Sequence, residues 1–250
     1  MNQPRIRLAE LTTDEAAERR GAVVVVPVGA VEQHGPHLPL GTDIRIAAGV
    51  AEAAVLRVEG TLLLDPLPIG CSEHHRSFPG TVSLRVRTFM DLVADVAGSL
   101  AADGFVPVFV NGHGGNRGPL NAALQELLER GVGAWAVTYF ERIGDEARQA
   151  FPADSMGHAC ALETSISLSL WPDLVRGDRI PARPGAPAYP DPSLFSTAGV
   201  VRHRRFEEFG PDGIVGDPRL ADEAKGAGIF SAAVERVAQT LRRIVGTRAD

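Results

Sequence analysis

The stretch Ala22-Val-Val-Val-Val-Pro-Val-Gly29 is apolar at every position and rich in β-branched residues. A strand exposed on one face would alternate apolar and polar residues, so this run predicts a strand buried on both faces. Similar apolar runs, bounded by glycine or proline, occur at 61–67, 105–110 and 132–139. Strands of this kind are typical of a parallel sheet covered by helices on both sides.

Segments with helical periodicity lie between these runs. Apolar residues recur at i, i+4 spacing from Ile46 to Val55, and helices are expected at 87–102, 116–130 and 219–244. The alternation predicts an α/β fold, a three-layer αβα sandwich with a mostly parallel central sheet. The 250 residues fit one hydrophobic core, so a single domain, 1–250, is expected. The segment 181–218 is rich in proline and glycine, and we expect it to cover a site or contact a neighbouring subunit.

The composition excludes several classes of partner. The chain is 44% hydrophobic and 22% charged, which is typical of a soluble globular protein. Its net charge of −6 would repel phosphate backbones, so nucleic acid is not an expected partner. No apolar run approaches the roughly 20 residues of a membrane span, so no membrane partner is expected. A charged N-terminus and only two cysteines favour a reducing, cytoplasmic location.

The densest polar cluster, Val-Glu-Gln-His-Gly-Pro-His-Leu-Pro-Leu-Gly-Thr-Asp at 31–43, directly follows the first predicted strand. In an extended chain, Glu32 and His34 project to the same side, as two ligands of one metal cluster should. Asp43 opens the next predicted helix, where its carboxylate can bridge two cations. Taken singly, Asp43 is better explained as a helix N-cap, and Glu32 and His34 as ordinary loop residues. The group together predicts a metal or catalytic site.

A second cluster, Asn-Gly-His-Gly-Gly-Asn at 111–116, follows the third predicted strand. Functional groups gather at the carboxyl ends of parallel strands, so His113 is expected to join the first cluster. An alternative from another class is a nucleotide-binding module using the Gly112–Gly115 turn. Against it, the third glycine of a dinucleotide fingerprint would fall at Arg117, and His113 would have no role.

Two further clusters follow. His158 and Glu163 would stand about 140° apart on one helix, so they cooperate only if His158 lies in the loop before it. A buried structural histidine and an exposed acid explain these two residues equally well. In Glu73-His-His-Arg-Ser-Phe78, adjacent histidines cannot easily bind one ion. We therefore expect His75 and Phe78 to contact substrate. His74 is a candidate to contact substrate or to support a metal ligand, but a position at the surface explains it better.

At this point the sequence resembles the creatininase family of metal-dependent amidohydrolases. The resemblance rests on Glu-x-His-Gly-x-His-Leu-Pro-Leu-x-Thr-Asp at 32–43, Asn-Gly-His-Gly-Gly-Asn at 111–116 and His-Ala-x-x-x-Glu-Thr-Ser at 158–165, with Phe-Pro-Gly-Thr at 78–81 and Gly-Asp-Pro at 216–218. It implies an αβα sandwich, a homo-hexamer, and hydrolysis of a peptide or non-peptide amide C–N bond in a small-molecule or short-peptide substrate.

The resemblance also implies a ligand set for two divalent metal ions, of zinc, manganese or iron. Glu32, Asp43 and His113 would hold one ion, and His34, Asp43 and Glu163 the other, with Asp43 bridging them. His158 and Glu163 are the candidate catalytic residues, His158 as the group that moves a proton to the leaving nitrogen.

Two positions depart from creatininase proper. By the resemblance, creatininase proper has an acidic ligand at the position of Gly115 and a lid tryptophan at the position of Asp154. Creatinine is therefore not the expected substrate. The pattern Ser72-x-x-His75-x-x-Phe-Pro-Gly-Thr81 is more similar to the branch of the family that trims the mycofactocin precursor peptide.

Overall fold

The computed structural model describes residues 5–187 and 203–247 and has a four-stranded parallel sheet at its centre. The strands follow the spatial order β2-β1-β3-β4, and every neighbouring pair is parallel. Their bounds are β1 (Val23–Val28), β2 (Thr61–Leu63), β3 (Val106–Asn111) and β4 (Trp135–Thr138). Helices connect them, as parallel strands require.

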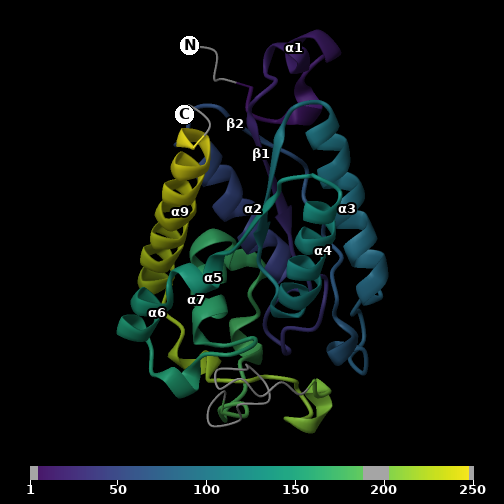
Figure 1. Ribbon diagram of the computed structural model, residues 1–250. Coiled ribbons are helices and arrows are strands. Elements are labelled where there is room, and N and C mark those ends of the chain that lie inside the picture. Colours follow the sequence, from purple (N-terminus) through teal and green to yellow (C-terminus); the bar gives the residue numbers. More distant parts are fainter. Residues whose placement is uncertain (1–4, 188–202, 248–250) are drawn as a thin grey trace.

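The helices cover both faces of the sheet (Figure 1). One face carries α2 (Thr42–Val55), α7 (Ala161–Leu170) and α9 (Glu223–Gly246), and the other carries α3 (Val86–Ala102) and α4 (Arg117–Glu129). Three shorter helices are α1 (Thr13–Glu18), α5 (Tyr139–Arg142) and α6 (Gly144–Ala150). The prediction of an α/β three-layer sandwich is confirmed.

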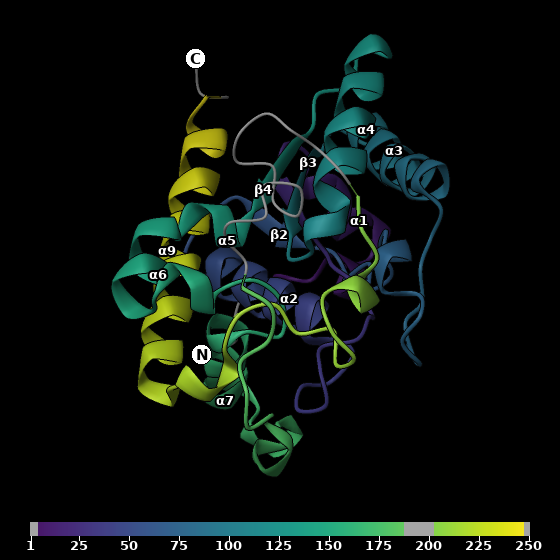
Figure 2. The same ribbon diagram turned by 90° about the horizontal axis from the view of Figure 1, so that it is seen from below.

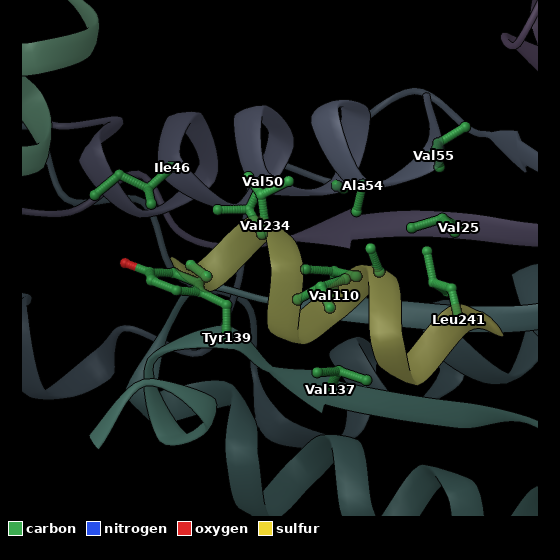
Figure 3. Close-up of a cluster of buried hydrophobic side chains, with 14 of the residues drawn as sticks. Val25, Ile46, Val50, Ala54, Val55, Val110, Val137, Tyr139, Val234 and Leu241 are labelled. Carbon is green, nitrogen blue, oxygen red and sulfur yellow. The ribbon is translucent and has the colours of Figure 1, made fainter. Parts of the chain in front are cut away.

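Successive residues of β1 supply the two cores, which explains the absence of polar alternation in its sequence. Val23 and Val25 point into the core beneath α2 and α9, whereas Val24 and Val26 point into the core beneath α3 and α4. Figure 3 shows the first core, where Val25 lies near side chains from α2 and α9. All four valines are fully buried, and each contributes about 1.5–3 kcal/mol relative to an exposed side chain.

Two strands differ from their predicted form. The second run was expected at 61–67, but β2 covers only Thr61–Leu63, because Pro66 and Pro68 lack the N–H that a strand donates. The fourth run was expected to be buried on both faces, yet Trp135 is 49% exposed. Because β4 lies at the edge of the sheet, its first residues have a neighbouring strand, β3, on one side only.

The carboxyl ends of the strands point to the lower end of the molecule in Figure 1, and Figure 2 views the molecule from that end. The described part of the 181–218 segment passes under this edge, where the backbones of Val215 and His158 pair in an antiparallel bridge. Residues 188–202 of the segment lie outside the described residues. Within the described ranges, no helix is both long and apolar enough to cross a membrane.

Candidate metal centre

The loop between β1 and α2 places Glu32 and His34 inside the molecule. The loop closes on itself, because the backbone N–H of Glu32 donates to the carbonyl of Leu40 at 2.9 Å. Gly35 allows the turn with a φ of 64°, a conformation that favours glycine. The side chains of Glu32 and His34 are 1% and 0% exposed. The loop therefore directs a carboxylate and an imidazole towards one interior point.

Asp43 lies between two imidazoles. The N-cap of α2 is Gly41, so the alternative role of Asp43 as an N-cap is wrong. Its Oδ1 is 3.1 Å from Nε2 of His34, and its Oδ2 is 2.9 Å from Nδ1 of His113. The two oxygens of one carboxylate thus face two separate groups of donors.

One further carboxylate lies on each side of Asp43. Oε1 of Glu32 is 3.3 Å from Nδ1 of His113, and Oε1 of Glu163 is 3.9 Å from Nε2 of His34. The backbone N–H of Cys160 holds the other oxygen of Glu163 at 3.3 Å. The structure therefore brings together five residues that span the chain from Glu32 to Glu163.

Backbone carbonyls fix the ring orientation of both histidines. Nδ1 of His34 donates to the carbonyl of Glu32 at 3.2 Å, and Nε2 of His113 donates to the carbonyl of Cys71 at 3.1 Å. A carbonyl only accepts, so the proton of each neutral ring lies on that nitrogen. The other nitrogen presents its lone pair to the carboxylates, as a metal ligand does.

The burial and chemistry of these donors fit divalent cations. Oε2 of Glu32 is buried and accepts no hydrogen bond from the described residues, and the buried Oδ2 of Asp43 faces Nδ1 of His113, which carries no proton when that ring is neutral. Burying carboxylates without compensation costs several kcal/mol each. Donors about 2.1 Å from a shared zinc ion lie roughly 3–4 Å apart, close to the distances found here. A cation on each side of Asp43 would compensate the negative charge of these buried carboxylates.

Without a cation, the same groups hold protons. Burial lowers the pKa of His34, but Asp43, Glu163 and Glu32 outweigh it and raise that pKa to about 9. The pKa of His113 is raised well above its usual value because Glu32 and Asp43 outweigh its burial. Burial raises the pKa of Glu163 to about 7. Cation binding must therefore displace protons from this centre.

His158 lies in the loop before α7, as its cooperation with Glu163 requires. Its Nε2 donates to the backbone carbonyl of Gln33 at 2.7 Å, and its Nδ1 is 3.8 Å from Oε1 of Glu32. Burial and the neighbouring His34 lower the pKa of His158 well below its usual value. His158 is therefore neutral, with its free nitrogen facing the carboxylates.

His75 contacts a carboxylate of the centre directly. It is 1% exposed, its Nε2 is 3.2 Å from Oε1 of Glu32, and its Nδ1 is 2.9 Å from Nε2 of Gln33. The amide of Gln33 also donates to the carbonyl of Gly213 at 3.0 Å and accepts from the N–H of Gly35 at 2.9 Å. These contacts orient the amide so that its NH₂ faces His75, which leaves the proton of His75 on Nε2, towards Glu32.

Aromatic contacts bring two further residues, Phe206 and His74, to the centre. The ring of Phe206 covers His75 and His158, with centroid distances of 3.9 and 4.9 Å. His74 was expected at the surface but is partly buried, with its ring stacked on His113. Burial lowers the pKa of His74 to about 3. Phe78 packs against the small apolar cluster of Phe206 and Val215. No periodicity or motif indicated the position of Phe206.

Two of the three glycines of the 111–116 turn, Gly112 and Gly115, are required by packing between protein groups. A Cβ on Gly112 would lie 2.5 Å from the carbonyl oxygen of Asp43, and one on Gly115 would lie 2.5 Å from Nε2 of His113. Both positions therefore let the turn approach α2 and the histidines closely. This explains Gly112 and Gly115 without a phosphate ligand.

The three-layer sandwich is shared with amidohydrolases that act on C–N bonds, and the chain belongs to one such family, the creatininase family. The family profile described as "Creatininase: Creatinine amidohydrolase" matches residues 9–241. The mycofactocin precursor peptide peptidase of Mycobacterium ulcerans (strain Agy99) is 34% identical over 228 residues, which cover 88% of this chain and 84% of the relative.

Two creatininases show how far the likeness extends. The creatinine amidohydrolase of Pseudomonas putida is 30% identical over 257 residues, covering 94% of this chain and 95% of the relative. A solved structure described as "Creatininase Mn" superposes with a TM-score of 0.78 at 29% identity, covering 95% of this chain and 98% of that one.

Proposed function

We propose that this protein is a metal-dependent hydrolase that cleaves an amide C–N bond in a small molecule or short peptide. The observation that carries the proposal is the placement of Asp43 between His34 and His113, with Glu32 and Glu163 on either side. Glu32, Asp43 and His113 would hold one divalent cation, and His34, Asp43 and Glu163 a second. Bound there, the cations supply Lewis acidity that polarises a carbonyl and activates water.

The residues around the cations handle the proton. The free Nδ1 of His158 faces the carboxylates, and its Nε2–H is held by the carbonyl of Gln33. His158 would accept the proton of the attacking water at Nδ1 and deliver it from Nδ1 to the leaving nitrogen. General acid–base groups of this kind contribute typically 10²–10⁴-fold to the rate. Phe206 covers His158 and His75 and limits the access of bulk water to them.

A short peptide is the substrate class that we favour. The relatives named as mycofactocin precursor peptide peptidases reach 35% identity, against 30% for the creatinine amidohydrolase. The sequence also lacks the acidic residue and the lid tryptophan expected for creatinine, at Gly115 and Asp154. Trimming of the mycofactocin precursor peptide is therefore the specific candidate. Hexameric assembly and a cytoplasmic location stay predictions.

Removal and restoration of metal test the proposal. We expect chelation to abolish hydrolysis of the mycofactocin precursor peptide and added Zn²⁺ or Mn²⁺ to restore it, with creatinine a poor substrate throughout. Cleavage would be followed by mass spectrometry and bound metal by elemental analysis. Full activity after complete removal of metal would refute metal dependence, whereas preferred hydrolysis of creatinine would refute only the choice of substrate.

The variant His158→Ala separates catalysis from metal binding. It should keep the metal content of the wild type and lose activity by about 10²–10⁴-fold, because only the proton-transfer group is removed. Unchanged activity would exclude the role given to His158. For the nucleotide-binding alternative, NAD or ATP should raise the melting temperature and Zn²⁺ should not, the reverse of what we expect.

A further inference from the structure

His74 lies over the half of the metal centre that contains His113. It belongs to the 3₁₀ helix Glu73–His75, which follows the loop after β2. The ring of His74 stacks on that of His113 with a centroid distance of 5.6 Å and an interplanar angle of 12°. Its outer side contacts Phe206 at a centroid distance of 5.4 Å. The imidazole is thus held between a ligand of the centre and the aromatic cover.

The ring nitrogens of His74 have no hydrogen-bond partner among residues 5–187 and 203–247. The neighbouring histidines all have one: His34, His113 and His158 each donate to a backbone carbonyl, and His75 accepts from Gln33. Nothing in the described protein therefore occupies the lone pair of His74. A partly buried imidazole in this state is free to bind a cation.

Gly115 makes the position of His74 possible. A Cβ at this residue would lie 2.7 Å from Cε1 of His74 and 2.5 Å from Nε2 of His113. Carbon atoms do not approach so closely, and both rings are packed, so any side chain at 115 would force His74 away from His113. The bare backbone of Gly115 gives the histidine its space.

The donor atoms are close enough for a shared cation. One ligand atom each of Glu32, His74 and His113 lie within 4.8 Å of one another. Two donors on opposite sides of an ion at about 2.1 Å are roughly 4.2 Å apart, so a shift of less than about 1 Å brings the three donors within reach of one cation. Glu32 and His113 already belong to the half-site that includes Oδ2 of Asp43.

We propose that His74 is a fourth protein ligand of the cation held by Glu32, Asp43 and His113. This inference rests on the proposed function, since it requires that half-site to bind a metal. His74 would approach the cation from the side covered by Phe206. The two half-sites would then differ, with two imidazoles in the one containing His113 and a single imidazole in the one containing His34.

Metal affinity measured without substrate tests the inference. The variants are His74→Phe, which keeps a ring but has no donor, and His74→Glu, which restores a donor. His203→Ala, a substitution at an exposed histidine, is the matched control. Zn²⁺ affinity would be measured by competition with a chelator, and Co²⁺ binding by visible absorption. Melting curves would establish that each variant is folded.

We expect His74→Phe to lower the affinity for one of two bound Zn²⁺ ions by at least the roughly 10–100-fold typical when a residue that supports a metal ligand is lost. The variant should also change the visible absorption spectrum of bound Co²⁺. His74→Glu should recover much of this affinity, and His203→Ala should match the wild type. Wild-type affinity and an unchanged spectrum in His74→Phe would overturn the role of His74 while leaving the hydrolase intact. A wild-type protein that binds no metal would instead refute the proposed function itself.

Discussion

At the residue scale, the hydrogen bond that one ring nitrogen of an imidazole makes decides which role the other ring nitrogen can have. His34, His113 and His158 all donate to backbone carbonyls, and backbone positions are set by the fold. The tautomer of each neutral ring is therefore fixed before any ligand binds. His34 and His113 present their free nitrogens to Asp43, whereas that of His158 is 3.8 Å from Glu32 and has no close partner. This difference separates candidate ligands from the candidate proton carrier.

Gln33 should be important for stability although it touches no cation position. Its amide satisfies three groups from different segments: the Nδ1 of His75, the carbonyl of Gly213 and the N–H of Gly35. Leaving a buried polar group unpaired costs about 1–3 kcal/mol. We expect Gln33→Ala to lower the free energy of unfolding by at least that amount, measured by urea denaturation.

Gln33→Glu is the informative companion of this variant. Its carboxylate can still accept from Gly35 but cannot donate to Gly213, so it should recover only part of the lost stability. Both variants should also lower kcat, because His75 and the 213–217 segment lose their anchor, while keeping Glu32, Asp43 and Glu163 as ligands. Wild-type stability in Gln33→Ala would show that the amide has no such role.

The residues of the centre differ in how far sequence could predict them. Glu32, His34 and Asp43 are dense in one short stretch, and His113 follows another strand, so the topology alone indicated that they would meet. His74 was expected at the surface because adjacent side chains diverge. Its actual position depends on the space left by Gly115, a contact 41 residues away that no local pattern encodes.

At the element scale, the contact between α7 and α9 positions Glu163. A Cβ on Gly226 of α9 would lie 1.9 Å from the carbonyl oxygen of Ser165, so the two helices meet at bare backbone. Ser165 also accepts, through its hydroxyl, the N–H of Asp222 at 2.9 Å. The first turn of α7, which carries Glu163, is thereby fixed against the start of α9.

Substitution of Gly226 by alanine should push these helices apart. Overpacking of this kind lowers the free energy of unfolding by typically about 1–3 kcal/mol. Displacement of α7 should also weaken the binding of the cation that Glu163 and His34 would hold. Gly228→Ala in the same helix is the matched control, because Gly228 is exposed and a Cβ there meets nothing within 4 Å. It should raise stability by about 0.5–1 kcal/mol. Equal effects in urea denaturation would contradict the role of the contact.

The order of elements was predictable because strand and helix periodicities are strong in this chain. The boundaries of the strands and helices were less predictable. β2 ends early because prolines interrupt the run that follows Leu63. The part of 181–218 that lies under the sheet has no periodicity. Val215 exchanges two backbone hydrogen bonds with His158, and the carbonyl of Gly213 accepts from the side-chain amide of Gln33. Such contacts depend on the completed fold. Sequence patterns therefore indicated only that the segment covers a site or contacts a neighbouring subunit.

At the scale of the whole molecule, the centre joins segments that are distant in the chain. The β1–α2 loop, the turn after β3 and the start of α7 contribute Glu32, His113 and Glu163. A cation that holds them together binds only the folded state. It therefore stabilises the whole protein by about 2.7 kcal/mol when its free concentration is 100 times its Kd.

The pH dependence of this stabilisation follows from the histidines. In the metal-free protein, the pKa of His34 is raised from 6.5 to about 9, so its contribution to stability is present below pH 6.5 and lost as pH rises through 9. His113 acts in the same direction. Since cations compete with these protons, metal-induced stabilisation should instead grow over the same range.

Melting temperatures recorded between pH 6.5 and about 9, with and without Mn²⁺, test both trends. We expect the metal-free curve to fall and the increase caused by Mn²⁺ to become larger as the pH rises. Asp43→Asn, which replaces the carboxylate shared by both half-sites with a neutral amide, should show a much smaller increase at every pH. A metal effect that is independent of pH, or equally large in Asp43→Asn, would place the binding of Mn²⁺ elsewhere on the protein, because neither His34 nor Asp43 would then be involved.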